Sequence, residues 1–296
     1  MIAVMGATGH TGRIVSERLL EEGLGVRALG RSADRLAGLV AKGAEPAVGE
    51  ATDADYLTGA FGGADAIYTL LPPNLQAEDY LAFQDRVGEA IVGAIKDSGV
   101  GHVVFLSSVG ADQPAGTGPI AGLHRQEERL RPLEGVDVLS LRPGFFFENH
   151  FETLGLIKHQ GINGGAVAPD TALPAIATRD IAAAAAEALA KRDFSGFVVR
   201  ELLGPRDMTM TEATEIIGNA IGKPDLTYVQ FPYEEFRASL TQMGIPANIA
   251  ALYTEMAQAF NDGRVRSLEG RSAANTTPTS FETFAAEVLA PAYEAA

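Results

Sequence analysis

The first residues that could do chemistry are three glycines near the N-terminus, in Gly6-Ala7-Thr8-Gly9-His10-Thr11-Gly12. In such a loop the first glycine permits a tight turn, the second lets the backbone approach a diphosphate, and the third lets a helix pack closely on a strand. The N–H groups at the start of that helix attract the anion. Because the loop follows a predicted strand, a diphosphate site is favoured over a glycine-rich turn that binds nothing. We therefore predict cofactor contacts from Gly6, Thr8, Gly9, His10, Thr11 and Gly12.

The residues after the second predicted strand indicate which nucleotide binds. A site for NAD usually places Asp or Glu there to bond the ribose 2′-hydroxyl. This chain has Gly30-Arg31-Ser32 instead, and Arg31 lies 31 − 12 = 19 residues beyond the last glycine. The guanidinium of Arg31 suits a 2′-phosphate, Ser32 can donate to it, and Arg35 adds a second cation one helical turn later. We predict NADP(H) as the cofactor; the alternative is that both arginines are solvated surface charges.

Other strand ends are expected to border the same cofactor. Leu71 and Pro72, at the end of the fourth predicted strand, and Ser107, after the fifth, are predicted contacts. Gly49-Glu50 ends the third strand and is a candidate border of the adenine. Asp53 has two equal interpretations, a cofactor contact or the cap of the helix that it precedes.

No tyrosine of this chain is followed by lysine four residues later, the usual acid–base pair of a short-chain dehydrogenase. The lysine of that pair lowers the pKa of the phenol so that it can relay a proton, yet none of the seven tyrosines has one there. Ser108 could bond the nicotinamide ribose or a substrate carbonyl, and His124 could polarise a carbonyl or deliver a proton. Alternatively, Ser108 only ends a strand, and His124 only pairs locally on a helix face that looks solvated because of Arg125, Glu127, Glu128 and Arg129.

Three consecutive phenylalanines follow the sixth predicted strand, in Leu141-Arg142-Pro143-Gly144-Phe145-Phe146-Phe147-Glu148-Asn149. They cannot all point inward, so some are expected to line an apolar pocket. We predict a substrate pocket that includes Phe145, Phe146 and Asn149. The equal alternative is that the phenylalanines close the seam between the core and a second lobe.

Short apolar runs alternate with helical patterns through the first half of the chain. The predicted strands are Ile2–Met5, Gly25–Leu29, Glu45–Val48, Ala66–Leu71, His102–Leu106, Val136–Leu141 and, later, Phe197–Leu203. The predicted helices between them are Arg13–Glu22, Asp34–Lys42, Asp53–Phe61, Tyr80–Ser98 and Arg125–Leu133. This alternation is typical of a parallel sheet covered by helices on both faces.

The rhythm changes after Gly144. Asn163-Gly164-Gly165 indicates a turn or loop, and Thr178 or Asp180 can cap a helix over Ile181–Lys191. Thr209–Met256 is mostly helical by pattern, and Phe281–Val288 is the last helix. We predict an α/β fold, a doubly wound Rossmann sheet with a smaller, mostly helical C-terminal lobe. Its boundaries are an NADP-binding domain over residues 1–150 and a substrate lobe over 151–296, with about 176–204 returning to the sheet.

Composition excludes several classes of function. The 296 residues carry a formal net charge of −15, which opposes binding to nucleic acid. With no cysteine there is no thiolate nucleophile or Cys-ligated metal, and we expect no metal site. The N-terminus does not resemble a signal peptide, and no run of about 18 apolar residues predicts a membrane span. We expect a cytoplasmic protein; the sequence leaves monomer and homodimer open.

Together, these segments resemble the NmrA-like group of atypical short-chain dehydrogenases/reductases. The matching pieces are the glycine loop, Gly30-Arg31-Ser32, Phe105-Leu106-Ser107-Ser108, the segment Leu141 to Asn149, Thr178-Arg179-Asp180-Ile181 and Thr277-Pro278-Thr279-Ser280-Phe281. They run along nearly the whole chain, more loosely in the lobe. By position, the resemblance implies that Arg31 and Arg35 are the cations for the 2′-phosphate and that His124 lies near a histidine that some members keep on this helix.

The resemblance implies two functions, because the family includes NADPH-dependent quinone reductases and proteins that bind NADP(H) without turnover as redox sensors. We favour an NADPH-dependent reductase that transfers hydride to a quinone-like or carbonyl small molecule, apolar or aromatic. Such a transfer needs a bound nicotinamide and an adjacent acceptor, and solvent can protonate the product. The alternative is a non-catalytic sensor that acts through a protein partner, which the absent Tyr–Lys pair favours.

Overall fold

A seven-stranded parallel sheet forms the centre of the molecule, a computed structural model that describes residues 1–295. Its strand order is β10-β6-β5-β4-β1-β2-β3. This confirms the predicted doubly wound sheet. The strands are β1 (Ile2–Val4), β2 (Val26–Gly30), β3 (Glu45–Val48), β4 (Ala66–Leu70), β5 (His102–Leu106), β6 (Asp137–Pro143) and β10 (Phe197–Leu202).

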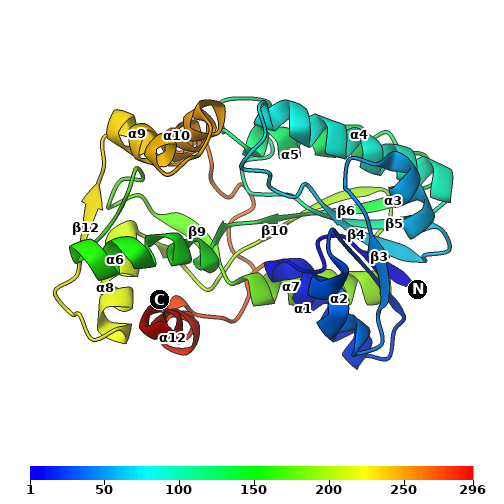
Figure 1. Cartoon of the computed structure of the whole chain (residues 1–296), viewed down its shortest axis with the longest axis horizontal. Coiled ribbons are helices and arrows are strands. Elements are labelled where there is room, and N and C mark those ends of the chain that lie inside the picture. The colour runs from blue at the N-terminus through cyan, green and yellow to red at the C-terminus, as the bar shows by residue number, and fades with distance from the viewer. Residues whose placement is uncertain (296) are drawn as a thin grey trace.

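Helices cover both faces of this sheet (Figure 1). Because successive strand residues point to opposite faces, Val4 of β1 joins one hydrophobic core and Ala3 joins the other. The core around Val4 packs under α1 (His10–Glu21), α2 (Ala33–Val40) and α7 (Thr178–Lys191). The core around Ala3 packs under α3 (Ala54–Phe61), α4 (Tyr80–Ser98) and α5 (Ile120–Leu130).

The strand order reverses between β1 and β4, which lie side by side in parallel register. From β1 the chain continues outward to β2 and β3, and from β4 it continues the other way to β5 and β6. In an open α/β sheet, ligands bind in the crevice that this reversal leaves beyond the carboxyl ends of the strands.

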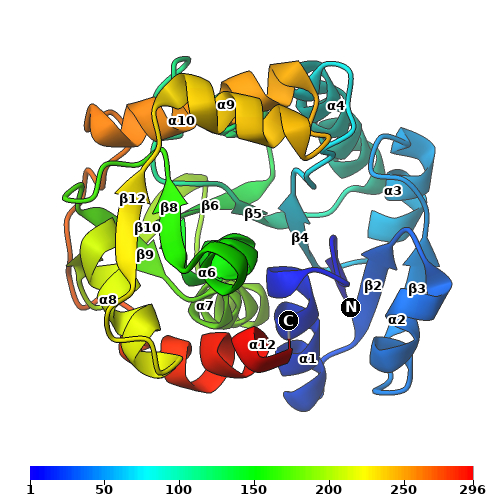
Figure 2. The same cartoon turned by 60° about the vertical axis from the view of Figure 1, so that its left-hand side comes forward.

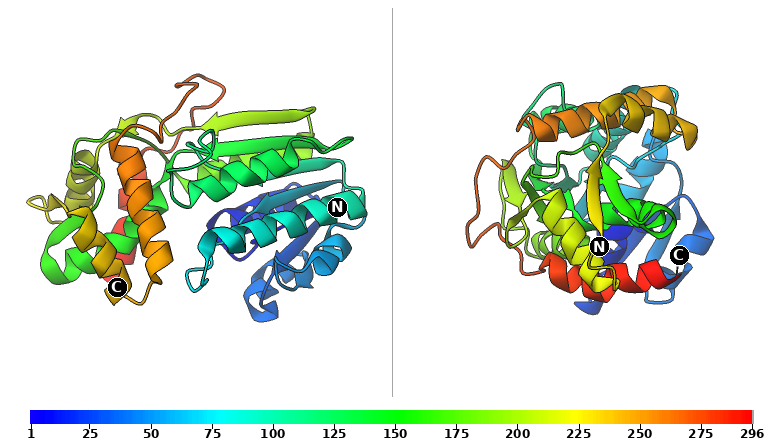
Figure 3. Two further views of the ribbon diagram at one scale, coloured as in Figure 1. Left: turned by 90° about the horizontal axis from the view of Figure 1, so that it is seen from above. Right: turned by 90° about the vertical axis from the view of Figure 1, so that its left-hand side faces the viewer.

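The later segments form a lobe at one end of the molecule, beyond those carboxyl ends (Figures 1 and 3). Two small sheets belong to it, β11-β9-β7 and β12-β8. Their strands are β7 (Phe145–Phe146), β8 (Ile162–Gly165), β9 (Leu173–Ile176), β11 (Asp207–Met208) and β12 (Thr227–Gln230). The helical segments are a 3₁₀ turn (Phe147–Thr153), α6 (Leu154–Gln160), α8 (Met210–Ala220), α9 (Tyr233–Gln242), α10 (Ala247–Asn261), α11 (Phe281–Phe284), a π-turn (Ala285–Leu289) and α12 (Ala290–Ala295). Figure 2 shows α9 and α10 lying side by side across the top of this lobe.

The prediction of a turn or loop at Asn163-Gly164-Gly165 is wrong, because these residues belong to β8 and pair in parallel with β12. A side chain on Gly164 would meet the ring of Phe231 at 2.7 Å, so the glycine makes room for that ring. The buried amide of Asn163 donates to Thr214 Oγ1 at 2.8 Å. These small residues allow β8 to pack closely against its neighbours, although in the sequence alone they are typical of a turn.

Two predicted helix starts also differ from the structure. The helix predicted from Arg125 begins five residues earlier, at Ile120, directly after Pro119. Neither Thr178 nor Asp180 caps α7, whose N-cap is Ala177 without a side-chain bond. The carboxylate of Glu148 accepts from the backbone N–H of Thr178 at 3.0 and 3.1 Å and so performs the cap from a distant segment.

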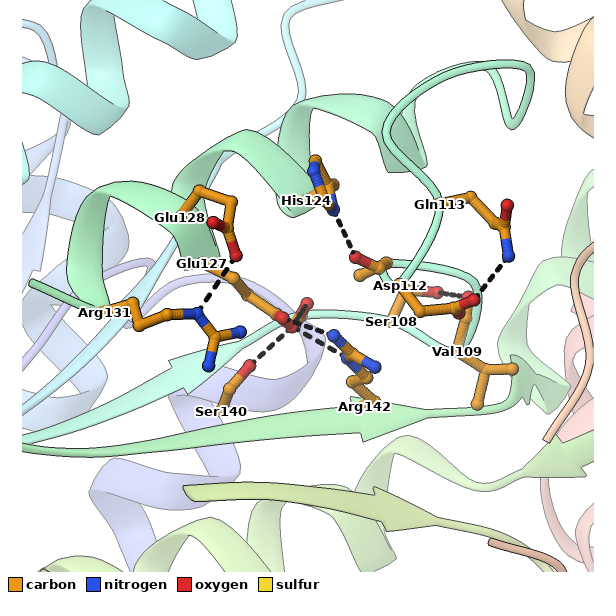
Figure 4. Close-up of polar contacts among 12 residues, drawn as sticks. Ser108, Val109, Asp112, Gln113, His124, Glu127, Glu128, Arg131, Ser140 and Arg142 are labelled. Carbon is orange, nitrogen blue, oxygen red and sulfur yellow. Dashed lines mark hydrogen bonds and ion pairs between the residues drawn. The ribbon is translucent and has the colours of Figure 1, made fainter. Parts of the chain in front are cut away.

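A buried ion pair ties α5 to the carboxyl ends of β5 and β6 (Figure 4). The side chain of Glu127 is only 1% exposed, and Arg142 donates to both of its oxygens, at 2.9 and 2.5 Å. Ser107 and Ser140 donate to Glu127 Oε1 at 2.6 and 2.8 Å. The expectation of a fully solvated charged face on this helix is therefore wrong for Glu127. Its neighbour Glu128 is exposed and bonds Arg131.

None of the helices within residues 1–295 combines the length and the apolar character needed to cross a lipid bilayer.

Removing the Glu127 carboxylate should strongly destabilise the fold. In Glu127→Ala the guanidinium of Arg142 stays buried without its counter-charge, so the free energy of unfolding should fall by about 3–5 kcal/mol. Urea denaturation followed by circular dichroism measures this change. The matched control is Glu128→Ala, which removes the same charge from the exposed neighbour and should shift the free energy by about 0.5 kcal/mol or less. Equal losses in the two variants would contradict the anchoring role.

Candidate functional site

One cavity of about 800 Å³ lies at the strand reversal and extends into the lobe. Its wall begins at the glycine loop, follows the ends of β2 to β6, and continues to α9 and α10. Most of the sequence-predicted site residues line it: Gly6, Thr8, Gly9, His10, Thr11, Arg31, Arg35, Leu71, Pro72, Ser107, Ser108, Phe145, Phe146 and Asn149. Gly12, Ser32 and His124 do not reach its wall.

The glycine loop has the geometry that a diphosphate requires. Gly6 has a φ of 62°, a left-handed conformation that glycine adopts without strain. A Cβ on Gly12 would clash with the carbonyl oxygen of Gly6, so only glycine lets α1 pack this closely on the loop. The N-cap of α1, Gly9, makes no side-chain bond, and its first turn carries no acid. The N–H groups there are thus available to an anion, and the loop fits the diphosphate of a dinucleotide.

Two cations lie beside this loop, at the end of β2. Arg31 and Arg35 are exposed on the cavity wall, and neither forms an ion pair with any acid in residues 1–295. Arg35 Nη2 donates to the carbonyl of Thr8 at 3.4 Å, which holds the guanidinium over the loop. Ser32 Oγ accepts from the backbone N–H of Arg35 and so caps α2. The two arginines can hold a 2′-phosphate, while Ser32 is used by the helix.

The remaining strand ends complete this half of the cavity. Glu50 and Gly49 line it, and a Cβ on Gly49 would strike the ring of Tyr56 at 2.5 Å. Asp53 lies outside the cavity wall and caps α3 by accepting from the backbone N–H of Tyr56 at 3.0 Å. Of the two roles predicted for Asp53, cofactor contact and helix cap, the structure therefore shows the cap. Thr11 is buried at the start of α1, and its hydroxyl accepts from Tyr68 at 3.0 Å.

His124 does not line the cavity in this structure, and of the two interpretations that the sequence leaves open the structure shows the local pairing. It lies in the second turn of α5, and its Nδ1 is 2.8 Å from the carbonyl oxygen of Ala111 (Figure 4). The α5 residues that line the cavity are Ile120 and Leu123, in the first turn of the helix. The helix therefore presents apolar side chains to the cavity.

Ser107 and Ser108 both line the cavity, but their hydroxyl groups have different hydrogen-bond partners. The buried Ser107 donates its hydroxyl hydrogen to Glu127 at 2.6 Å, so its oxygen faces a ligand only as an acceptor. Ser108 is half-buried, and its hydroxyl donates to the carbonyl of its neighbour Val109 at 2.9 Å, a bond that a ligand could replace. Both serines follow β5, which fixes them at the centre of the crevice.

The lobe contributes polar cavity residues that sequence reasoning missed. Glu152, in the 3₁₀ turn, and Tyr253, on α10, line the cavity together with Tyr80, on α4. Burial raises the pKa of the Glu152 carboxyl. Burial, followed by the negative charge of Glu152, raises the pKa of Tyr253, so its phenol stays protonated at neutral pH. No local sequence signal marks these residues, because α4, the turn and α10 meet only in the folded chain.

His150 is a second missed residue of the cavity wall. It is 4% exposed, and its ring lies between Phe145 and Phe281, with centroid distances of 5.8 and 4.9 Å. Its Nε2 has no hydrogen-bond partner within the described residues. Burial lowers the pKa of His150 from 6.5 to about 4, so the imidazole is neutral at physiological pH.

The described part of the chain, residues 1–295, contains no cluster of three or more His, Asp or Glu side chains that could hold a metal ion.

The buried His150 should make the protein less stable as the pH falls. The folded protein resists protonation of His150 down to about pH 4, while the unfolded chain takes up the proton near pH 6.5. Its contribution is therefore present above pH 6.5 and is lost on acidification, by about 2 kcal/mol between pH 7 and pH 5. Urea titrations at both pH values should show a smaller pH dependence for His150→Phe. The exposed control His159→Phe should keep the wild-type pH dependence; if both variants behave alike, His150 is not the group.

The packing at Gly12 should be essential for nucleotide binding. A methyl group in Gly12→Ala forces α1 away from the loop and misplaces the N–H groups, so the Kd for NADPH should rise at least about tenfold. Fluorescence titration measures this Kd. The control is Gly38→Ala, at a helical glycine whose added Cβ meets nothing within 4 Å. This variant should bind as the wild type does. Unchanged binding by a folded Gly12→Ala protein would overturn the assignment of the loop.

Comparison with known proteins gives results that agree with this geometry. The model of the NmrA-like family matches residues 1–285. An NAD(P)H azoreductase of Xenophilus azovorans is 29% identical over 263 residues, covering 86% of each chain. Quinone oxidoreductase 2 of Escherichia coli is 27% identical over 258 residues, again 86% of each chain. The crystal structure of the NADPH-dependent quinone oxidoreductase of Escherichia coli complexed with NADPH superposes with a TM-score of 0.81 at 22% identity, covering 98% of this chain and all of that one. Since the family model covers nearly the whole chain, this protein belongs to the NmrA-like family.

Proposed function

We propose that this protein is an NADPH-dependent reductase of quinone-like small molecules. The observation that carries the proposal is one continuous cavity that joins a dinucleotide-type anion site to an aromatic chamber. At one end are the glycine loop and two unpaired arginines; at the other are Phe145, Tyr253 and Phe260. The relatives named as an NAD(P)H azoreductase and a quinone oxidoreductase support the same assignment.

The residues of this chain would hold NADP(H) in a fixed order along the cavity. The start of α1 would bind the diphosphate, and Arg31 and Arg35 would bind the 2′-phosphate through charge-assisted bonds. Ser107 and Ser108 lie further along, where the ribose of the nicotinamide would reach. When bound, the nicotinamide supplies a hydride, two electrons with one proton.

The chain's own contribution to the reaction is alignment and the exclusion of water. Apolar side chains from α5 and the segment after β6 surround the place where a flat acceptor would lie, including Leu123 and Phe145. Tyr253, whose phenol stays protonated, can donate a hydrogen bond to an acceptor oxygen and lower the barrier to its reduction. The reduced oxygen then takes its proton from water, so the absent Tyr–Lys pair is no obstacle to quinone reduction.

The test combines nucleotide titration with a panel of acceptors. The wild type should bind NADPH more tightly than NADH, and quinones should accelerate the loss of the near-ultraviolet absorbance of NADPH. In the double variant Arg31→Ala/Arg35→Ala the Kd for NADPH should rise about tenfold or more, while that for NADH changes about twofold at most. Arg18→Ala, an exposed arginine on α1, is the matched control and should change neither value.

Each failure in this experiment has its own meaning. If both nucleotides lose affinity equally in the double variant, the arginines do not read the 2′-phosphate. If NADPH binds tightly but no quinone or carbonyl compound oxidises it above background, the reductase is contradicted. That result would favour the alternative, a sensor of NADP(H) that acts through a protein partner, which requires different affinities for the oxidised and reduced forms.

A further inference from the structure

Helices α4 and α5 pack against each other through two glutamines that face glycines. On α4, Gln84 lies against Gly122, where an added Cβ would stand 2.0 Å from Oε1 of the glutamine. On α5, Gln126 lies in the same way against Gly88, with its Oε1 at 2.1 Å from an added Cβ. Each glutamine therefore occupies the space that a side chain of the facing residue would fill. Both glutamines are buried, so the packing holds their carboxamides in few orientations.

Neither carboxamide has a hydrogen-bond partner within residues 1–295, but only one of them reaches the cavity. In Gln126 both the nitrogen and the oxygen are enclosed by protein, and this residue does not line the cavity. Gln84 is 3% exposed and lines the cavity, and of its two polar atoms only Oε1 is enclosed. The Nε2 group of Gln84 therefore faces the cavity. A buried amide without a partner destabilises the fold, and a ligand that accepts its hydrogens removes that cost.

Tyr80 adds a second donor from the same face of α4. It lies four residues before Gln84, a spacing that places two Cβ atoms about 5–6 Å apart on one side of a helix. Tyr80 is 4% exposed and lines the cavity. Its hydroxyl is not enclosed and makes no hydrogen bond to the part of the chain that the structure describes. The first two turns of α4 thus bring two uncharged donors to the cavity wall.

These donors border the place where the proposed function puts the acceptor. Gln84 lies against Gly122 of α5, and the next residue along that helix, Leu123, belongs to the apolar wall of this place. Ile120, two residues before Gly122, lines the cavity as well. A flat acceptor that packs on these apolar side chains therefore has the carboxamide of Gln84 beside it.

We propose that Gln84 is a catalytic residue, and that with Tyr80 it donates hydrogen bonds to the acceptor oxygen on which negative charge develops. Hydride, two electrons with one proton, converts a quinone into the anion of its hydroquinone, and water then protonates that anion. Neutral donors held at the developing charge stabilise the transition state more than the bound quinone, so they accelerate the reaction. The inference rests on the proposed function for the hydride transfer, but the binding of a negatively charged oxygen belongs to the chain alone.

The first experiment measures binding without turnover. Calorimetry would compare 4-nitrophenolate, which carries a negative oxygen on its ring, with nitrobenzene, which lacks that oxygen. NADP+ is present throughout, so that the arginines beside the glycine loop are occupied and no hydride is supplied. In Gln84→Met the affinity for 4-nitrophenolate should fall about tenfold or more, the size of one hydrogen bond to a charged group. The affinity for nitrobenzene should change about twofold at most, because methionine keeps the volume of the side chain.

Gln126→Met is the matched control, since it removes an equally unpaired carboxamide from the same pair of helices without touching the cavity wall. It should bind both compounds as the wild type does. Equal losses of 4-nitrophenolate affinity in the two variants would show an effect of helix packing and would overturn the inference.

The second experiment measures turnover of 1,4-naphthoquinone with NADPH. In Gln84→Met and in Tyr80→Phe, kcat should fall about tenfold or more while KM changes about twofold at most, because the donors act mainly in the transition state. Gln126→Met should keep the wild-type values. Tyr80→Phe removes a single hydroxyl, so it tests the same site even if Gln84→Met does not fold.

The outcomes separate this inference from the proposed function. Wild-type kcat in Gln84→Met and Tyr80→Phe would overturn the inference and leave the reductase standing. Loss of 4-nitrophenolate binding in Gln84→Met alone, in a protein that oxidises no NADPH with any acceptor, would support the oxygen-binding role and contradict the reductase.

Discussion

The cavity floor depends on one buried carboxylate. Glu127 accepts from Ser107, which follows β5, and from Ser140 and Arg142 of β6. A charge buried this deeply is tolerated only with a full set of partners, so the four groups can adopt very few arrangements. Because the partners come from two strands, the position of α5 along the sheet is fixed by the pair. The place of Ser107 in the crevice follows from the same constraint.

This use of α5 explains why the helix has no acid–base pair. Its sheet-facing side is occupied by the Glu127 anchor, and His124 bonds the backbone of the preceding loop. What α5 offers the cavity is apolar, Ile120 and Leu123. Because α5 offers no proton donor to the cavity, the site favours hydride transfer to an acceptor that solvent can protonate. Quinones meet this condition better than simple carbonyl compounds do.

A feature of this structure is predictable from the sequence when the residues that form it are close together in the chain. The glycine loop and Arg31 were predictable because strand, turn and helix follow one another within the first 31 residues. The burial of Glu127 was not predictable, because its neighbours in the sequence are charged residues typical of an exposed helix face. Its partners Ser140 and Arg142 belong to another element, β6. Similarly, Asn163-Gly164-Gly165 taken alone indicates a turn or loop. The reason for its small residues is Phe231, far along the chain, whose ring occupies the space next to Gly164. Glu152 and Tyr253 lie about a hundred residues apart in the chain, and only the folded protein brings both to the wall of one cavity.

The two ends of the cavity differ in what shapes them: backbone geometry at the glycine loop and side chains in the lobe. The cofactor end is held by backbone geometry at Gly6 and Gly12, where any side chain would strain the loop or collide with it. The lobe end of the cavity is lined by side chains of α10 and the 3₁₀ segment, and other residues of both segments belong to the hydrophobic clusters of the lobe. A substitution at Glu152 or Tyr253 therefore changes the cavity wall in the lobe and leaves the backbone of the glycine loop in place.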